Sequence, residues 1–279
     1  MLKLLWPNPA ALVKSEKTKT LLIADPHLGW ETSLQEKGIH VPSQTEKILH
    51  KLTAIISKYK PQELVILGDV KYTVISSELG EWHDVPDFFA KLQTRIEDIA
   101  IVRGNHDANI EPLLPEKVRL LPATGAVIGD VGVFHGHKWP SPALLGCRAL
   151  VMGHLHPVVV FRDLTGFKIT RQVWMKSNCN SQALAKILLQ KHNVKIEDSV
   201  EQTLKKHYHI SLQAKEIFIM PSFNDFLGGR PVNEARSREK GVESLIGPVL
   251  RSEAVDVDDA ELFLLDGTYL GRLNQLRSL

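Results

Sequence analysis

Gly104-Asn105-His106-Asp107 is the stretch that decides the fold, because it ends the short apolar run Ile99-Ala100-Ile101-Val102 with an amide, an imidazole and a carboxylate. A four-residue apolar run that stops at a turn residue is typical of a buried strand. Strings of the same kind recur between residues 25 and 156: Asp25-Pro26-His27, Gly68-Asp69, His135-Gly136-His137 and Gly153-His154-Leu155-His156. Only a fold can bring all five together, so the sequence predicts one site built from the ends of several strands.

Before residue 105 the expected elements follow the order strand, helix, strand, helix, strand. This order predicts a parallel βαβαβ unit. Strands are expected at 20–24, 64–67 and 99–102, and helices at 43–59 and 84–96. Ser43 and Glu46 form a capping-box pattern for the first helix, and Pro86 falls in the first turn of the second.

After residue 125 the pattern changes to short strands, and most of their connections are too short to contain a helix. Antiparallel pairing is therefore expected. These strands are expected at 127–128, 131–134, 150–152, 158–161, 167–175 and 217–220. Segment 181–206 has helical spacing and predicts a helical excursion, whereas 228–241 reads as a polar loop. Asp266-Gly267 is a hairpin signal. We expect residues 1–279 to form a single domain.

The composition is that of an ordinary globular protein, with 279 residues, 43% hydrophobic, 24% charged, and a net charge of only +2. A dedicated nucleic-acid-coating surface usually carries a larger basic excess. The two cysteines, Cys147 and Cys179, form no Cys-x-x-Cys pair, which argues against a disulfide framework and a thiolate zinc site. Pro7-Asn8-Pro9 breaks the apolar N-terminus, and no apolar run approaches a membrane span. We therefore expect a cytoplasmic protein that does not contact a membrane.

The side chains in these strings are metal ligands of mixed type. In an extended segment residues i and i+2 point the same way, so Asp25 and His27 would lie side by side, as would His154 and His156. Oxygen and imidazole ligands together suit Mn, Fe, Zn or Ni rather than Ca. Asp69 could bridge two cations through its carboxylate.

Two further ligands, Asn105 and His135, complete a set large enough for two metals. Two divalent ions about 3.5–4 Å apart clamp the attacking and leaving oxygens of a phosphate ester. His106 is the natural proton donor to the leaving oxygen, with Asp107 expected to orient it. Each string taken alone is more often a strand-end turn, but six of the twelve histidines fall inside the ordered set.

The ordered pattern D-x-H, GD, GNHD, H and GH-x-H resembles that of the calcineurin-like metallophosphoesterases, with the match running from Asp25 to His156. The resemblance implies an α/β fold: a four-layer α/β/β/α sandwich of two mixed sheets flanked by helices. It implies two metal sets that share one carboxylate. One set is Asp25, His27, Asp69 and His156, and the other is Asp69, Asn105, His135 and His154.

A narrower resemblance covers more of the chain. The strings Ala24–Gly29, Gly38–Pro42, Gly68–Lys71 and Pro221–Asn233 look like archaeal phosphoesterases related to the SbcD nuclease, and like DNA-ligase-associated metallophosphoesterases. Two departures stand out. Val70-Lys71-Tyr72 follows Gly68-Asp69 where the broad family often has an acid or a histidine, and Pro26 holds a slot that commonly has another residue.

Several residues near the strings are candidate substrate contacts, and a structural or solvated role is about as frequent for each. The candidates chosen for substrate binding are Arg103, His137 and Lys71. Weaker candidates are Lys138 and Arg148 for phosphate, Trp82 and Trp139 for stacking, and Arg230, Arg236, Arg238 and Lys240 as a basic flap.

The sequence therefore predicts a metal-dependent phosphoesterase with two divalent transition-metal ions, Mn foremost. A phosphodiesterase acting on nucleotides or DNA is the first hypothesis. A small-molecule phosphomonoesterase is the second, and a scaffold of the same fold without catalysis is the third. A homodimer and a DNA-repair partner protein are further expectations.

Overall fold

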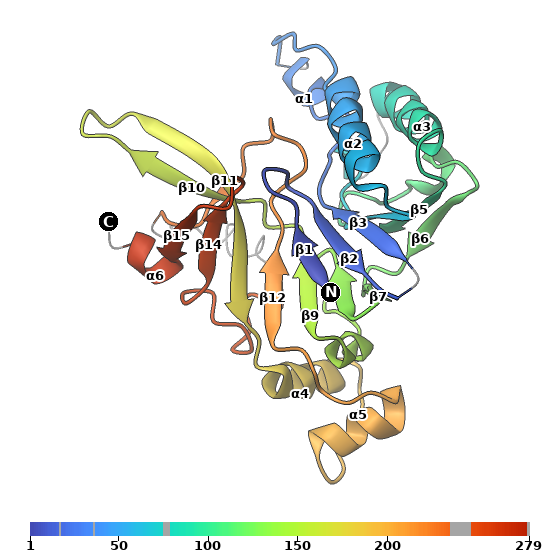
Figure 1. The fold of residues 1–279 in the computed structure, drawn as a ribbon, viewed down its shortest axis with the longest axis vertical. Coiled ribbons are helices and arrows are strands. Elements are labelled where there is room, and N and C mark those ends of the chain that lie inside the picture. Colours follow the sequence, from blue (N-terminus) through green and yellow to red (C-terminus); the bar gives the residue numbers. More distant parts are fainter. Residues whose placement is uncertain (17, 36, 75–78, 235–246, 278–279) are drawn as a thin grey trace.

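The structure, a computed structural model, describes residues 1–279 except 17, 36, 75–78, 235–246 and 278–279. Two sheets lie face to face, and helices cover their outer faces (Figure 1). This is the mixed α/β sandwich that the sequence resemblance implied, and that prediction is confirmed.

The first sheet has six strands in the order β1-β2-β3-β4-β5-β6. The strands are β1 (Leu2–Leu4), β2 (Ala11–Lys14), β3 (Lys19–Ile23), β4 (Glu63–Ile66), β5 (Asp98–Val102) and β6 (Val118–Leu121). Strands β3 to β6 run parallel, as the βαβαβ pattern predicts. The antiparallel strands β1 and β2 are absent from the sequence prediction, because Pro7-Asn8-Pro9 forms the connection between two strands rather than the end of regular structure.

Two long helices lie against this sheet, α2 (Thr45–Tyr59) and α3 (Leu79–Gln93), and the short α1 (Thr32–Gln35) precedes them. The capping-box prediction is wrong: the N-cap is Gln44, with no side-chain cap hydrogen bond, and Glu46 pairs with Lys91 of α3 instead. Helix α3 begins five residues before the predicted start, so Pro86 lies inside it rather than in its first turn.

The second sheet has nine strands, with β13-β10-β11-β12-β9-β8-β7 as its main path and β14 and β15 joined to β11. The strands are β7 (Ala126–Ile128), β8 (Val131–Phe134), β9 (Ala149–Met152), β10 (Pro157–Arg162), β11 (Lys168–Asn178), β12 (Glu216–Ile219), β13 (Arg230–Pro231), β14 (Glu261–Leu264) and β15 (Tyr269–Arg272). The antiparallel expectation holds for β7–β8, β10–β11 and the hairpin β14–β15.

That expectation is wrong for β8–β9 and β9–β12, which are parallel. The chain between β8 and β9 is long enough to cross over because it contains the 3-10 helix η2 (Pro142–Gly146), which packs on the sheet. Helices α4 (Ser181–Lys191) and α5 (Val200–Tyr208) occupy the segment of the predicted helical excursion, and α6 (Leu273–Leu276) and η1 (Glu111–Leu113) are single turns. The single-domain prediction stays a prediction.

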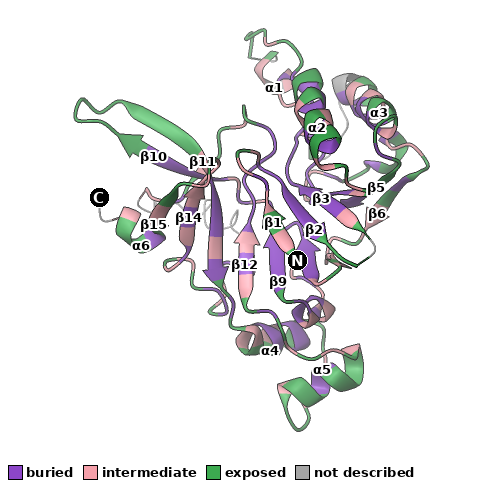
Figure 2. Cartoon of the chain, viewed as in Figure 1, coloured by how far each residue is buried: buried purple, intermediate pink, exposed green. Residues whose placement is uncertain are grey.

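Three layers of buried apolar side chains stabilise this arrangement. Along β3 successive side chains alternate between two of these layers. Leu21 and Ile23 pack among the residues of α2 and α3, whereas Leu22 and Ala24 pack between the two sheets. The third layer joins the outer face of the second sheet to α4, α5 and η2. Because strands such as β3 are buried on both faces (Figure 2), polar side chains gather where the strands end.

Candidate metal centre

The candidate metal ligands lie at the carboxyl ends of five strands from both sheets. Asp25 follows β3, Asp69 follows β4, and Asn105 follows β5 in the first sheet. His135 and His154 follow β8 and β9 in the second. The carboxyl edge of parallel strands is where α/β folds build their sites, because the chain leaves the sheet there through loops free to carry function.

Five of these ligands have left-handed backbone conformations. The φ angles are 54° for Asp25, 43° for His27, 52° for Asp69, 69° for His154 and 47° for His156. This corrects the expectation that Asp25-Pro26-His27 and His154-Leu155-His156 are extended. Non-glycine residues with positive φ cost free energy and concentrate at functional sites, where the surrounding structure enforces them.

The ligand atoms form two clusters that share one residue. Asp25, His27, Asp69 and His156 make one cluster, and Asp69, His135 and His154 make the other. Within each cluster the ligand atoms lie within 4.8 Å of one another. Asn105 joins the second cluster, because its Oδ1 lies 3.1 Å from His135 Nε2. The structure therefore brings together all seven residues that the sequence nominated as ligands, in the two sets that the resemblance implied.

Asp69 lies between the clusters. Its Oδ2 atom is 3.6 Å from His27 Nε2 on one side and 3.3 Å from His135 Nε2 on the other. Its Oδ1 atom accepts a hydrogen bond from the His106 N–H at 2.9 Å, which leaves Oδ2 for the clusters. One carboxylate oxygen facing two imidazole sets is the arrangement that a bridging ligand requires.

The charges of the centre fit a pair of cations. Burial opposes ionisation of Asp25 and Asp69, but the neighbouring histidines outweigh it and lower the pKa of both carboxyls. Burial also disfavours a charged His135, yet Asp69 raises its pKa to about 10. Burial lowers the pKa of His27 to about 3 and that of His154 to about 4, so both rings are neutral and able to coordinate. Burial likewise opposes the charged form of His156, but Asp25 favours that form and raises the pKa of His156. The two buried carboxylates thus draw positive charge into the centre, a demand that bound cations would meet.

His135 has a fixed ring orientation. Its Nδ1–H donates to the Leu67 carbonyl at 2.7 Å, so Nε2 is the atom that faces Asp69 and Asn105. A hydrogen bond of this kind sets the tautomer and the direction of a metal-binding histidine. The bond also ties β8 to the end of β4, so the two sheets hold the second cluster jointly.

His106 is held by a partner that the sequence does not predict. Its Nδ1 atom is hydrogen-bonded to the Tyr72 carbonyl, while its Nε2 atom lies 3.9 Å from Asp69 Oδ2. Glu81 in the first turn of α3 secures the Tyr72 loop, because Oε1 accepts from Tyr72 N–H at 3.0 Å and from Thr73 N–H at 2.7 Å. Glu81 is only 1% exposed. No sequence signal connects this helix residue to His106.

Asp107 does not orient His106, which corrects the expectation above. Its carboxylate accepts three backbone N–H groups: Gly104 at 2.7 Å, Asp69 at 2.8 Å and Val70 at 2.8 Å. It therefore joins the loop after β5 to the loop after β4. Burial and the charge of Asp69 raise the pKa of Asp107 to about 6.

Gly104 is required by close approach. A Cβ atom at this position would lie 2.1 Å from Asp69 Oδ1 and 2.3 Å from Asp69 N. No real Cβ makes contacts of that length, so any side chain here displaces the shared ligand. The glycine of the Gly-Asn-His-Asp string thus serves the centre and not merely a turn.

The three predicted substrate contacts have different surroundings. Lys71 is fully buried, and its ammonium donates to the Thr73 carbonyl. Arg103 is paired with Glu111. His137 packs beside His135 and His154 with ring centroids 5.2 and 6.2 Å away, and burial lowers its pKa to about 3. As substrate contacts, all three stay predictions.

The weaker candidates for substrate binding also have different surroundings. Lys138 is exposed, Arg148 lines a separate cavity, Trp82 is exposed on α3, and Trp139 packs against the core. Arg236, Arg238 and Lys240 of the expected basic flap lie outside the described residues.

A cavity of about 430 Å³ opens onto both clusters. Its lining includes His27, Asp69, Asn105, His106, His154 and His156 from the centre, and Leu227, Gly229, Arg230 and Pro231 from the chain around β13. The sequence predicts this second wall only in part, because it places Arg230 in a polar, solvated loop. The cavity gives the proton-donor candidate and the ligand clusters a common open space.

Residues 18–214 match the family model of the calcineurin-like phosphoesterases. The chain belongs to this family. It is a metal-dependent phosphoesterase, and a family of this kind uses divalent metals, which the two clusters could hold.

Two solved structures are similar to the chain. One is the Pseudomonas putida nuclease MPE, 17% identical, with a TM-score of 0.47 over 95% of this chain and 98% of that one. The other is Yfce, a phosphoesterase from E. coli, 18% identical, with a TM-score of 0.33 over 52% of this chain and 73% of that one. A search of curated proteins finds no match. Among the described residues no helix is long and apolar enough to cross a membrane.

Proposed function

We propose that this phosphoesterase is a two-metal phosphodiesterase that acts on nucleotides or nucleic acid, with Mn²⁺ as its preferred metal. The observation that carries the proposal is the shared carboxylate: two clusters meet at Asp69 on the wall of a cavity that also contains His106. Mixed carboxylate, amide and imidazole ligands suit Mn²⁺ among the divalent metals, with Fe, Zn and Ni as the competitors.

The side chains divide the work between binding and proton transfer. Asp25, His27 and His156 would hold one ion together with Asp69, and Asn105, His135 and His154 would hold the other with the same carboxylate. When bound, the two ions supply Lewis acidity that stabilises charge on the phosphoryl oxygens.

His106 supplies the proton. Because its Nδ1 atom is engaged by the Tyr72 carbonyl, Nε2 is the ring nitrogen that faces the centre and is placed to deliver a proton. The leaving oxygen of an alkyl or nucleoside ester is strongly basic, so a proton delivered there assists the bond to break.

The charge of the cavity favours a diester over a monoester. Among the described lining residues, Arg230 is the one Lys or Arg side chain. A diester carries a single negative charge, whereas a phosphomonoester carries about −1.5 to −2 at neutral pH and calls for more cationic partners. The phosphomonoesterase is therefore the second candidate. The non-catalytic scaffold is disfavoured, because the chain has a residue of the expected type at every candidate ligand position.

The biological setting is part of the proposal. The resemblance of Ala24–Gly29 and Pro221–Asn233 to SbcD-related phosphoesterases supports a role in DNA repair alongside a partner protein. Cys147 and Cys179 are free and buried, in keeping with a reducing cytoplasm.

The test is a metal-by-substrate screen of the purified protein. Metal is removed with a chelator, and Mn²⁺, Zn²⁺, Ni²⁺ or Mg²⁺ is restored against a nitrophenyl diester, a nitrophenyl monoester, a cyclic nucleotide and single-stranded DNA. The proposal expects no activity without metal, strongest recovery with Mn²⁺, and a higher kcat/KM for diesters. Full activity after exhaustive chelation contradicts the metal mechanism, and a monoester preference replaces the diesterase with the second candidate.

A further inference from the structure

The hairpin formed by β10 and β11 extends away from the rest of the molecule as a two-stranded arm (Figure 1). Every residue from 161 to 171 is exposed, whereas the base of the arm is buried (Figure 2). A two-stranded hairpin without a covered face is marginally stable in water. The arm therefore lacks, within the described chain, the packing that a hairpin of this length normally has.

The arm also gathers apolar side chains on its surface. Phe161 is 38% exposed, Ile169 38%, Phe167 64%, and Leu164 at the turn is completely exposed. Phe161 and Ile169 lie directly opposite each other in the strand register, so they share one face of the arm. Exposed apolar residues that cluster in this way mark interaction sites.

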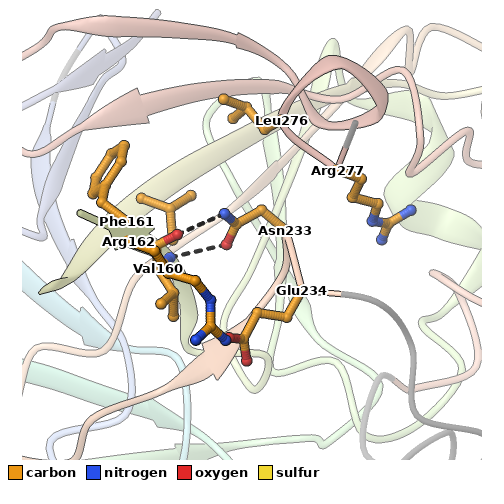
Figure 3. A pocket seen from close by; sticks show the side chains of 8 residues that line it. Val160, Phe161, Arg162, Asn233, Glu234, Leu276 and Arg277 are labelled. Carbon is orange, nitrogen blue, oxygen red and sulfur yellow. Dashed lines mark hydrogen bonds and ion pairs between the residues drawn. The ribbon is translucent and has the colours of Figure 1, made fainter. Parts of the chain in front are cut away.

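One edge of the arm is closed. Asn233 Oδ1 accepts from Val160 N–H, and Asn233 Nδ2 donates to Val160 O, each at 2.9 Å, so the side chain replaces a neighbouring strand (Figure 3). Beside it, Glu234 pairs with Arg162 and, at 3.5 Å, with Lys168. The strand β13 pairs only with Pro157 and Val158.

The edge of β11 that faces away from β10 is open over Lys168–Gln172. Strand β14 pairs with β11 from Val173 onward, and β12 from Met175 onward. The backbone N–H and C=O of Val160 point toward Asn233 and so away from β11. Thr170 lies opposite Val160, so its backbone N–H and C=O point away from β10 and toward the open edge. Among the described contacts there, the exposed Arg171 guanidinium of the same strand reaches the Thr170 carbonyl at 3.1 Å.

We propose that this edge binds the same edge of a second copy of the chain, giving a continuous four-stranded antiparallel sheet across a two-fold axis. The two-fold axis passes between Ile169 and its symmetry mate. The backbone N–H and C=O groups of Ile169 face β10, so the two Ile169 residues can lie opposite each other as a pair without mutual hydrogen bonds. Thr170 then exchanges backbone hydrogen bonds with Lys168 of the other copy. The result is an isologous interface, the commonest kind in homodimers.

Side-chain chemistry supports this register. Phe161 and Ile169 of one copy meet Ile169 and Phe161 of the other in one apolar row on the same face. Lys168 lies opposite Thr170, and Phe167 lies opposite Arg171, so no like charges face each other directly. A row of this kind covers apolar groups that each arm alone leaves in water.

A nucleic acid is a poorer occupant of this surface. Arg162 and Lys168 share the carboxylate of Glu234, which removes much of their free positive charge. The open edge offers backbone N–H and C=O groups beside apolar side chains, which match another strand better than a phosphate backbone.

Two matched pairs of variants test the proposal on the full-length protein. Thr170→Pro removes an N–H that the hairpin itself does not use, whereas Thr170→Ala keeps it. We expect light scattering to give a dimer for wild type and Thr170→Ala and a monomer for Thr170→Pro, with hydrolysis of a nitrophenyl ester unchanged as the folding control. Ile169→Cys, on the axis, should form an intermolecular disulfide under mild oxidation at least tenfold faster than Thr170→Cys.

Several results would overturn the proposal. A monomeric wild type at micromolar concentrations removes the interface, and loss of oligonucleotide binding in Thr170→Pro would then assign the arm to nucleic acid. A Thr170→Pro variant that remains dimeric places the interface elsewhere. Equal cross-linking at positions 169 and 170 contradicts the register.

Discussion

Glu81 offers a way to disturb His106, the proposed proton donor, without substituting a candidate metal ligand. Its carboxylate accepts the N–H groups of Tyr72 and Thr73 and the Thr73 hydroxyl, and the Tyr72 carbonyl holds His106. Glu81→Ala removes all three acceptor contacts, and Glu81→Gln keeps an oxygen for the two amides but not the charge. We expect both variants to retain metal and to lose rate, alanine more than glutamine.

The size of the effect follows from these contacts. A hydrogen bond to a charged acceptor is worth about 1.5–3 kcal/mol, so releasing two or three of them exceeds the roughly 1.4 kcal/mol that changes a local equilibrium tenfold. The Tyr72 loop should therefore leave its position most of the time in Glu81→Ala. A displacement of about 1 Å at a catalytic group can cost about 10²-fold, and general acid catalysis contributes about 10²–10⁴-fold in total. We expect a loss of about 10²-fold in kcat.

The assay compares two leaving groups. An oligonucleotide releases a basic alkoxide that needs a proton, whereas a nitrophenyl diester releases a good leaving group that does not. Glu81→Ala and His106→Ala should lose much more rate on the oligonucleotide than on the nitrophenyl diester, with metal content unchanged in both. An equal loss on both substrates, or loss of metal from Glu81→Ala, would refute the link from Glu81 through Tyr72 to His106.

Two further predictions follow from burial and close contact. Gly104→Ala should lower metal content and abolish activity, because its Cβ would lie 2.1 Å from Asp69 Oδ1. Gly38→Ala, which has a φ of 78° and nothing within 4 Å of the new Cβ, introduces backbone strain away from the centre and controls for strain alone; a Gly104→Ala variant with full metal content would contradict the prediction. Burial raises the pKa of Cys147 and Cys179 to about 11, so at pH 8 only about one thiol in 10³ is ionised and alkylation of the native protein should be far slower than in denaturant. Mass spectrometry measures this difference, and rapid native labelling would show that the two sites open readily.

The part of the fold that the sequence predicts well is the part whose strands are buried on both faces. Runs such as Leu64–Leu67 are apolar throughout and end at a glycine and a ligand, so both the strand and the residue after it can be read directly. The candidate ligands can be predicted because their types and order are specific. Their left-handed backbone cannot, since Asp and His adopt it more often than most residues but still uncommonly, and the contacts between loops impose it.

The errors have a common physical origin in long-range partners. Glu46 is predicted to cap a helix but pairs with Lys91. Asp107 is predicted to orient His106 but accepts hydrogen bonds from three backbone N–H groups of two loops. Tyr72 and Glu81 hold His106 through a carbonyl and a helix residue that local patterns do not connect. Most partners of these side chains are distant in the sequence and become neighbours only in the folded protein, so local patterns cannot predict them.

The most direct measurement of the central claim is the metal content of three proteins: wild type, His135→Ala and Asp69→Asn. The elemental content is determined for each after dialysis against Mn²⁺, with circular dichroism to verify that all three are folded. A shared carboxylate predicts about two ions per chain in wild type, about one in His135→Ala, and weakened binding of both in Asp69→Asn, because Asp69 Oδ2 faces both clusters. Equal metal content in wild type and Asp69→Asn would contradict the two-metal centre proposed for this chain.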